Sequence, residues 1–243
     1  MKICVAQTRP VKGDILTNID GHKKLIDLAV SFGSDIIIFP ELSITGYEPL
    51  LAKNLATDPD DTRFNEFQVI SNDKKIIIGL GVPTRAAENV CISMVLFQPH
   101  KSRQVYSKKY LHGDEEGFFV SGPNIPMLEG NKTGIALAIC YEISVPGHSE
   151  NAFKNGAGIY IASVAKSVPG VANAIDHLSG IANKYSMAVF MSNCVGYCDN
   201  FECGGKSSVW NDQGTLIGQL NEKNEGILIL DIETKEIIEE ILY

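Results

Sequence analysis

The stretch GIALAICYEISVPG, residues 134–147, is the element around which the rest of the chain is organised. Its first six residues are small or apolar, the composition of a strand buried on both faces. The run ends at Cys140, and Pro146 and Gly147 then break the segment. Ligands of α/β sheets bind beyond the carboxyl ends of the strands, so a thiol at this point faces a candidate site. Small buried cysteines are also common in ordinary cores, and the stretch alone leaves both interpretations open.

The composition is that of a globular enzyme or binding protein. The chain has 243 residues, of which 44% are hydrophobic and 21% charged, and its formal net charge is -8. Since no basic cluster offsets this charge, nucleic acid and anionic membranes are not expected as partners. No apolar run reaches membrane-spanning length, and residues 1–7 indicate a strand, not a signal peptide. Without a secretory signal the six cysteines are expected to be thiols, and we predict a cytoplasmic location.

Short apolar runs alternate with amphipathic stretches along the whole chain. We predict strands at residues 3–6, 35–39, 74–82, 90–97, 104–106, 134–140, 159–165, 188–194, 206–210, 216–220 and 226–232. Predicted helices cover residues 15–32, 64–70, 149–155 and 173–186, with residues 107–119 as an ordered loop. The alternation favours an α/β fold with helices on the sheet faces. Because no composition break interrupts it, we predict a single domain over residues 1–243, with 233–243 as a C-terminal tail.

Three chemistry-bearing residues follow predicted strands in a distinctive order. Glu41 follows Phe39-Pro40, Lys108 follows the 104–106 strand, and Cys140 ends the central run. This order and context resembles the nitrilase superfamily, the carbon–nitrogen hydrolases with a Glu-Lys-Cys triad. The resemblance implies a four-layer α-β-β-α sandwich and a homodimer or larger homo-oligomer, and we predict no cofactor. It also implies that Glu41 is the general base, Lys108 the catalytic lysine and Cys140 the nucleophile.

Two further patterns refine the assignment by resemblance. The family pattern Tyr-x-Lys-x-x-Leu selects Lys108 over Lys109. The pattern Glu-x-x-x-Phe-x-x-Gly selects Glu115 over Glu116 as a second glutamate of the site, although the run of acids leaves this choice open.

These residue types suit the hydrolysis of amides, which are poor electrophiles and need a thiolate nucleophile. Glu41 would take the thiol proton and later donate a proton to the leaving amine. Lys108 and the backbone N–H of Tyr141 would stabilise the oxyanion, before water hydrolyses the thioester on Cys140. We predict that Tyr47, Phe119 and Glu142 bind the substrate.

The predicted function is therefore an amidase that acts on a small-molecule amide or carbamoyl compound and releases ammonia or an amine. Nitrile hydrolysis is the alternative within the family, and a non-catalytic scaffold or a thiol redox protein are alternatives outside it. The chain has no arginine after Arg103, whereas acids stand at positions 48, 114, 116 and 142, so we expect a neutral or cationic amide.

Three cysteines remain without a role in this scheme. Cys194, Cys198 and Cys203 match none of the paired C-x-x-C zinc patterns, and we therefore predict no metal.

Overall fold

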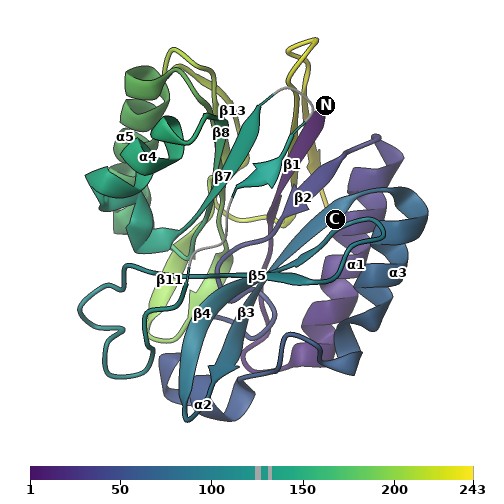
Figure 1. The fold of residues 1–243 in the computed structure, drawn as a ribbon, viewed down its shortest axis with the longest axis vertical. Coiled ribbons are helices and arrows are strands. Elements are labelled where there is room, and N and C mark those ends of the chain that lie inside the picture. The colour runs from purple at the N-terminus through teal and green to yellow at the C-terminus, as the bar shows by residue number, and fades with distance from the viewer. Residues whose placement is uncertain (124–126, 131–132, 243) are drawn as a thin grey trace.

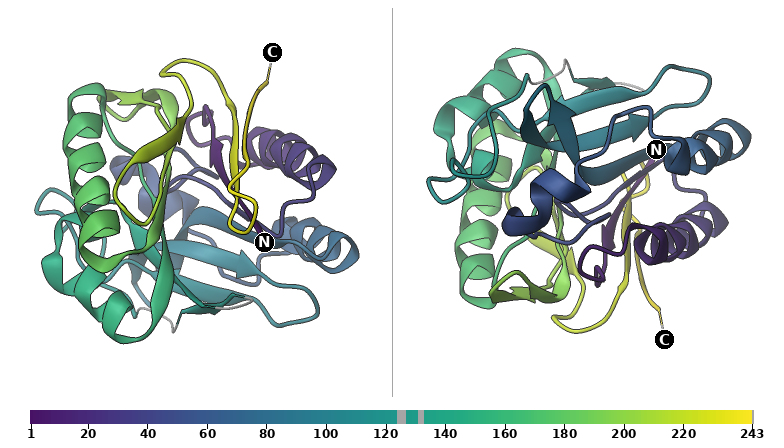
Figure 2. Two further views of the ribbon diagram at one scale, coloured as in Figure 1. Left: turned by 90° about the horizontal axis from the view of Figure 1, so that it is seen from above. Right: turned by 90° about the horizontal axis from the view of Figure 1, so that it is seen from below.

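Two β-sheets face each other and helices cover their outer sides. The computed structural model describes residues 1–123, 127–130 and 133–242. Figure 2 shows the two sheets at the centre, with one group of helices on each side, and Figure 1 labels the elements. The predicted four-layer α-β-β-α sandwich is confirmed.

The first sheet has seven strands in the order β15-β14-β1-β2-β3-β4-β5. These strands are β1 (Lys2–Gln7), β2 (Ile36–Ile38), β3 (Ile77–Ala86), β4 (Asn89–Phe97), β5 (Gln104–Ser107), β14 (Gly226–Asp231) and β15 (Ile237–Ile241). Its outer side carries α1 (Ile15–Ser31) and α3 (Asn65–Lys74), and the short α2 (Ala52–Leu55) lies at one end. Strand β2 pairs in parallel with β1 and β3, whereas β3, β4 and β5 form an antiparallel edge.

The second sheet has six strands in the order β13-β12-β9-β8-β7-β6. These strands are β6 (Leu128–Glu129), β7 (Gly134–Ile139), β8 (Ala157–Ser163), β9 (Ala188–Ser192), β12 (Ser208–Trp210) and β13 (Leu216–Gln219). Helices α4 (Pro146–Lys154) and α5 (Val168–Tyr185) cover its outer side. A separate hairpin, β10 (Val195–Cys198) and β11 (Phe201–Gly204), follows β9.

Alternating side chains of the central strands build three apolar layers. In β1, Ile3 and Val5 point into the layer between the sheets, whereas Cys4 and Ala6 point toward α1. A third layer packs the second sheet against α4 and α5. Burial on both faces explains why the central strands are continuous apolar runs in the sequence.

Hydroxyl groups connect the two sheets across their shared core. The Ser163 hydroxyl at the end of β8 donates to the backbone oxygen of Phe39 at 2.8 Å. The Ser192 hydroxyl at the end of β9 donates to the backbone oxygen of Ala6 at 2.6 Å. Phe39 precedes Glu41 by two residues, so the first bond helps to fix the end of β2 relative to the second sheet.

Several predicted boundaries were wrong. Strand β3 continues through the polar segment to Ala86, because a tight turn with Ala87 at φ 53° joins it directly to β4. Helix α5 begins at Val168, five residues before the predicted start, where the Ser167 hydroxyl accepts from the Gly170 N–H. Cys140 is not in the strand but begins a 3₁₀ turn, Cys140–Ser144.

The C-terminal segment contributes to the first sheet. Residues 233–243, predicted as a tail, contain β15, which pairs antiparallel with β14 and forms the sheet edge. Tyr243 lies outside the described residues. Among the helices of the described chain, none combines the length and the apolar character that a membrane crossing requires.

Candidate active site

Cys140 occupies a strained turn between β7 and the 3₁₀ helix. Its φ of 45° is in the left-handed region, where a residue with a side chain costs about 1–3 kcal/mol. The strain persists because β7 fixes the preceding residues and the Glu142 carboxylate accepts from the Ile139 N–H at 2.9 Å. Tyr141 lies in the first turn of the 3₁₀ helix, where N–H groups lack intrahelical acceptors. The turn therefore presents a thiol beside an available N–H donor.

Glu41 follows β2 in a loop that lies directly against β3. The oxygen of Gly79 accepts from the Phe39 N–H at 2.9 Å, and the oxygen of Gly81 accepts from the Ile44 N–H at 3.1 Å. A Cβ atom on Gly81 would lie 2.1 Å from the backbone oxygen of Pro40. Only glycine permits this close approach, so Gly81 sets the path of the loop that carries Glu41.

Lys108 connects two carboxylates in a fully buried position. Its backbone N–H donates to the oxygen of Ile92 in β4 at 2.8 Å, which extends the pairing beyond β5. Its Nζ donates to Glu41 Oε1 at 2.8 Å and to Glu115 Oε1 at 2.7 Å. The side chains of Lys108 and Glu41 are both 0% exposed. Desolvation of so many charges is tolerated because they are paired.

Glu115 is held by the loop that follows Lys108. Its Oε2 accepts from the His112 N–H at 2.8 Å, and its Oε1 accepts from the Tyr47 hydroxyl at 3.0 Å. Glu116, the other acid that the sequence allowed here, is exposed. The loop closes where the Gly122 N–H donates to the Lys108 oxygen at 2.9 Å, and a Cβ atom on Gly122 would lie 2.3 Å from that of Ser107.

The charges of the cluster shift one another's pKa values. Burial raises the pKa of Glu41, and Glu115 adds to the rise while Lys108 opposes it. Burial alone would lower the pKa of Lys108, but Glu41, Cys140 and Glu115 hold it above its ordinary value. Burial, together with the Glu41 carboxylate, raises the pKa of Cys140 to about 11. At neutral pH the resting site therefore holds a neutral thiol beside an ammonium group.

One oxygen of the Glu41 carboxylate is not engaged in a hydrogen bond with the described residues. Glu41 Oε2 is buried and accepts no hydrogen bond from any protein group in the part of the chain that the structure describes. The Cys140 thiol lies close enough for each group to shift the pKa of the other. The Glu41 carboxylate thus uses Oε1 to bind Lys108 and leaves Oε2 unengaged among the described residues.

Lys166 is a second cation at the site, and sequence reasoning missed it. The lysine follows β8, the strand next to β7, and its ammonium group interacts with Cys140, which raises the pKa of Lys166. Its backbone N–H donates to Asn193 Oδ1 at 2.8 Å. The rule that drew attention to Cys140, a polar residue at the end of a buried strand, also applies to Lys166 and could have found it.

The predicted substrate-binding residues lie in different surroundings. The Tyr47 hydroxyl touches Glu115 and therefore belongs to the site. Phe119 is buried in the core between the sheets. Glu142 is fully buried, and its carboxylate accepts from the Tyr106 hydroxyl, from Ile139 and from the backbone after Lys108. These bonds occupy the Glu142 carboxylate, so it positions the backbone and leaves no oxygen for a substrate.

A hollow of about 490 Å³ lies on the other side of the Glu142 network, beside α4. Tyr106, Lys109 and His148 line it, together with residues of α4 and β7. Glu41, Lys108 and Cys140 are not among its lining residues, so this hollow is distinct from the catalytic cluster.

The sandwich and the buried Glu-Lys-Glu cluster beside a strained cysteine define a hydrolase fold of the nitrilase superfamily. The family model described as "Carbon-nitrogen hydrolase" matches residues 2–240. The chain belongs to this family.

Solved structures with the same fold include mutants of an amidase from Nesterenkonia sp. AN1. One, with covalent addition of the acetamide moiety of fluoroacetamide at its active-site cysteine, is 22% identical, with a TM-score of 0.86 over 96% of this chain and 90% of that chain. Another, in complex with butyramide, is also 22% identical, with a TM-score of 0.87 over 97% of this chain and 92% of that chain.

Curated relatives differ in length. The "Hydrolase in agr operon" of Staphylococcus aureus is 24% identical over 98% of this chain and 93% of its own length. The glutamine-dependent NAD(+) synthetase of Thermotoga maritima is 24% identical over 97% of this chain but only 42% of its own length. The chain thus spans less than half of that synthetase.

Proposed function

We propose that the protein is an amidase that hydrolyses the carbon–nitrogen bond of a small linear amide through a thioester on Cys140. The observation that carries the proposal is the buried Lys108, bonded to both Glu41 and Glu115 beside the Cys140 thiol. A scaffold protein would gain nothing from burying these charges next to a strained thiol. A thiol redox protein would need a second cysteine in contact with Cys140.

The first half of the reaction transfers the thiol proton and forms the carbon–sulfur bond. Glu41 Oε2 takes the proton of Cys140 as the sulfur attacks the amide carbon. The developing oxyanion would receive hydrogen bonds from Lys108 Nζ and the Tyr141 N–H, each worth on the order of 3 kcal/mol. Glu41 then returns the proton to the departing nitrogen, which leaves as ammonia or an amine.

The second half hydrolyses the thioester. Water enters where the amine left, Glu41 takes one of its protons, and the resulting hydroxide attacks the thioester carbon. The same two donors would stabilise the second oxyanion. Collapse releases a carboxylic acid and returns the proton to the sulfur, so the resting thiol is restored. Lys166 would stabilise the thiolate form whenever it appears.

The acids that suggested a cationic substrate are mostly engaged elsewhere. Glu48 pairs with Lys12 at 2.6 Å, and Asp114 pairs with His112 at 2.6 Å. Glu142 is buried and satisfied, as described above. The two cations at the site, Lys108 and Lys166, are balanced by Glu41 and Glu115, which supports a neutral amide.

A second candidate substrate is the side-chain amide of glutamine. It is supported by the match of 97% of this chain to a glutamine-dependent NAD(+) synthetase. In this case the chain would release ammonia from glutamine by the same thioester chemistry.

Ammonia release from a panel of primary amides, glutamine, carbamoyl amines and nitriles tests the proposal. We expect turnover of at least one amide by the wild type and none by Cys140→Ala. Cys91→Ala is the matched control, because Cys91 is another buried free thiol, in β4. Turnover confined to nitriles would favour the alternative within the family. Equal turnover by Cys140→Ala would contradict the mechanism.

We further propose a cytoplasmic homodimer or larger homo-oligomer. The six free cysteines support a reducing compartment. Light scattering of the purified protein would measure the assembly, and a monomer at micromolar concentration would contradict it.

A further inference from the structure

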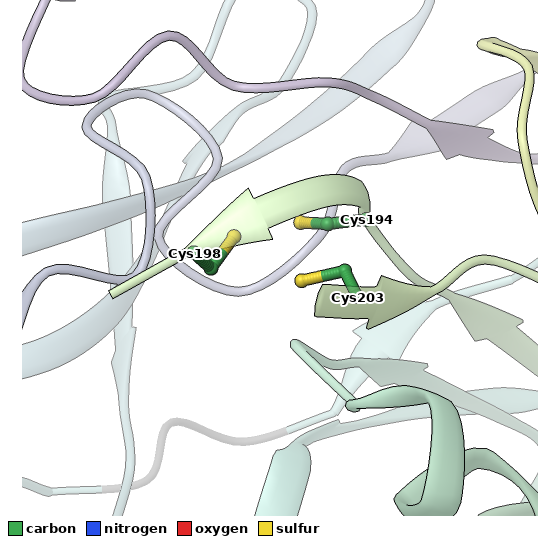
Figure 3. Close-up of side chains that lie close together, drawn as sticks. All are labelled: Cys194, Cys198 and Cys203. Atoms are coloured by element: carbon green, nitrogen blue, oxygen red, sulfur yellow. The ribbon is translucent and has the colours of Figure 1, made fainter. Parts of the chain in front are cut away.

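Three cysteines whose spacing in the sequence matches no paired metal-binding motif come together beside the active site. Cys194 precedes β10, Cys198 ends β10, and Cys203 lies in β11. Figure 3 shows their side chains pointing into one common space. The three sulfur atoms lie within 4.8 Å of one another, and all three side chains are buried. We refer to these residues as the thiol cluster.

The backbone around the thiol cluster is anchored on several sides. The Val195 N–H donates to the Thr8 oxygen at 2.9 Å, which ties the start of the hairpin to the end of β1. The Gly204 N–H donates to the Lys166 oxygen at 2.8 Å, and the Asp199 N–H at the hairpin turn donates to Glu48 Oε1 at 3.0 Å. The three sulfurs are therefore held together by the fold and do not need a ligand to bring them together.

The thiols also act on one another electrostatically. Hydrogen bonds from Cys194 and Cys203 lower the pKa of Cys198 to about 4, and the Tyr47 N–H contributes to the same effect. The pKa values of Cys194 and Cys203 are raised. The three sulfurs are thus close enough to interact directly with one another.

We propose that Cys194, Cys198 and Cys203 form a binding site for a thiophilic metal ion, with monovalent copper as the favoured occupant. Metal–sulfur bonds of about 2.3 Å in a trigonal site place the sulfurs about 4 Å apart, a small contraction from the observed cluster. Thiolate ligands select monovalent copper, and they also bind zinc. Among the described residues the ligand group consists of these three cysteines, whereas structural zinc takes four ligands.

Binding has a defined proton balance. Each cysteine that binds the ion as a thiolate releases its thiol proton to solvent, and no electrons are transferred. Tyr47 packs against the thiol cluster and also donates to Glu115, so the site borders the catalytic cluster. For this reason the test measures metal retention and not turnover, and it does not depend on the proposed function.

The experiment titrates the fully reduced wild-type protein with monovalent copper, without oxygen and in competition with a colorimetric chelator. We expect one copper ion per chain after desalting, and a higher melting temperature of the copper-loaded protein. Cys198→Ser should lower the affinity at least about 100-fold, since it removes a ligand and not merely an outer contact. Cys91→Ser and Cys140→Ala should retain one ion per chain.

Further arms keep the proposal open to refutation. If Cys198→Ser does not fold, Cys194→Ser and Cys203→Ser serve in its place, with circular dichroism as the folding check. A parallel titration with zinc that yields one zinc per chain, and no copper, would support the site and overturn the copper assignment. The proposal would be overturned if the wild type retained neither metal, or if folded variants of the thiol cluster retained as much metal as the wild type. It would also be overturned if the purified protein contained a disulfide within the thiol cluster and, after that disulfide was reduced, took up no metal.

Discussion

The carboxylate of Glu142 accepts a hydrogen bond of 2.8 Å from the backbone N–H of Lys109, the residue that follows Lys108. The same carboxylate accepts from the Ile139 N–H at 2.9 Å, directly before Cys140. One buried side chain therefore holds the backbone beside the lysine and the backbone beside the thiol at a fixed separation. The Tyr106 hydroxyl, which also contacts His148, donates to Glu142 at 2.6 Å and completes the network.

Replacement Glu142→Gln should impair both stability and turnover. The new amide group would point a donor at existing N–H or O–H donors, leaving buried groups unsatisfied, at a cost of about 3 kcal/mol in the free energy of unfolding. We expect kcat to fall at least tenfold with little change in KM, because the residue positions the reacting groups without touching substrate. Glu150→Gln, on the exposed face of α4, is the control and should stay within about 0.5 kcal/mol of the wild type. Wild-type kcat in a stable Glu142→Gln protein would refute the positioning role.

Replacement Gly81→Ala should displace the loop that carries Glu41. The added Cβ would meet the Pro40 oxygen and the Leu42 N–H, which are backbone atoms and cannot rotate away. A shift of Glu41, the proposed general base, by about 1 Å is expected to lower kcat on the order of 100-fold. Gly180→Ala is the matched control, since nothing lies within 4 Å of its Cβ position in α5, and it should raise stability by about 0.5–1 kcal/mol. The test compares kcat of Gly81→Ala and Gly180→Ala with that of the wild type. Wild-type kcat in Gly81→Ala would show that the loop tolerates the displacement.

His22 should make the protein less stable in mild acid. Burial lowers its pKa from 6.5 to about 4, with Nδ1 donating to the Asn18 oxygen and Nε2 close to the Ser43 hydroxyl. The unfolded chain binds a proton below pH 6.5 and the folded protein does not, so the stabilisation present above pH 6.5 is lost as the pH falls toward 4. The loss reaches about 3 kcal/mol by linkage.

Urea unfolding of the wild type and His22→Gln at pH 7 and pH 4 measures this contribution. The difference between the two proteins should carry the pH dependence, because other titrating groups are common to both. His177→Gln, which removes an exposed histidine of α5, should behave as the wild type. Identical pH dependence in His22→Gln and the wild type would contradict the assignment.

Lys166 should control the reactivity of the Cys140 thiol. With its pKa at about 11, Cys140 is mostly protonated at neutral pH, and its alkylation by iodoacetamide should accelerate as the pH rises toward that value. Lys166→Met removes a nearby positive charge, so the pKa should move further up and neutral-pH alkylation should slow about tenfold. Lys154→Met, on exposed α4, is the control. An unchanged alkylation profile in Lys166→Met would exclude an electrostatic role.

The parts of the site that follow buried strands could be predicted from the sequence. Glu41 and Cys140 stand where apolar runs stop, and the resemblance to the nitrilase superfamily brought Lys108 and Glu115 into the same hypothesis. The direction of the Glu142 side chain could not be predicted, because it depends on the left-handed turn at Cys140, which no local propensity encodes. For Cys194, Cys198 and Cys203 the sequence analysis predicted no metal, because their spacing matches no linear motif. It could not show that a two-residue turn at Asp199-Asn200 brings them together.

The hydroxyl bond from Ser163 to Phe39 has a practical consequence. In the proposed mechanism the base, Glu41, follows a strand of one sheet and the nucleophile, Cys140, follows a strand of the other, so turnover would depend on how well the two sheets are aligned. A perturbation that lets the layers slide by a fraction of an ångström would extinguish catalysis while the circular dichroism spectrum stayed unchanged. An activity assay on this protein therefore also tests the relative position of the two sheets, which a probe of helix and strand content does not measure.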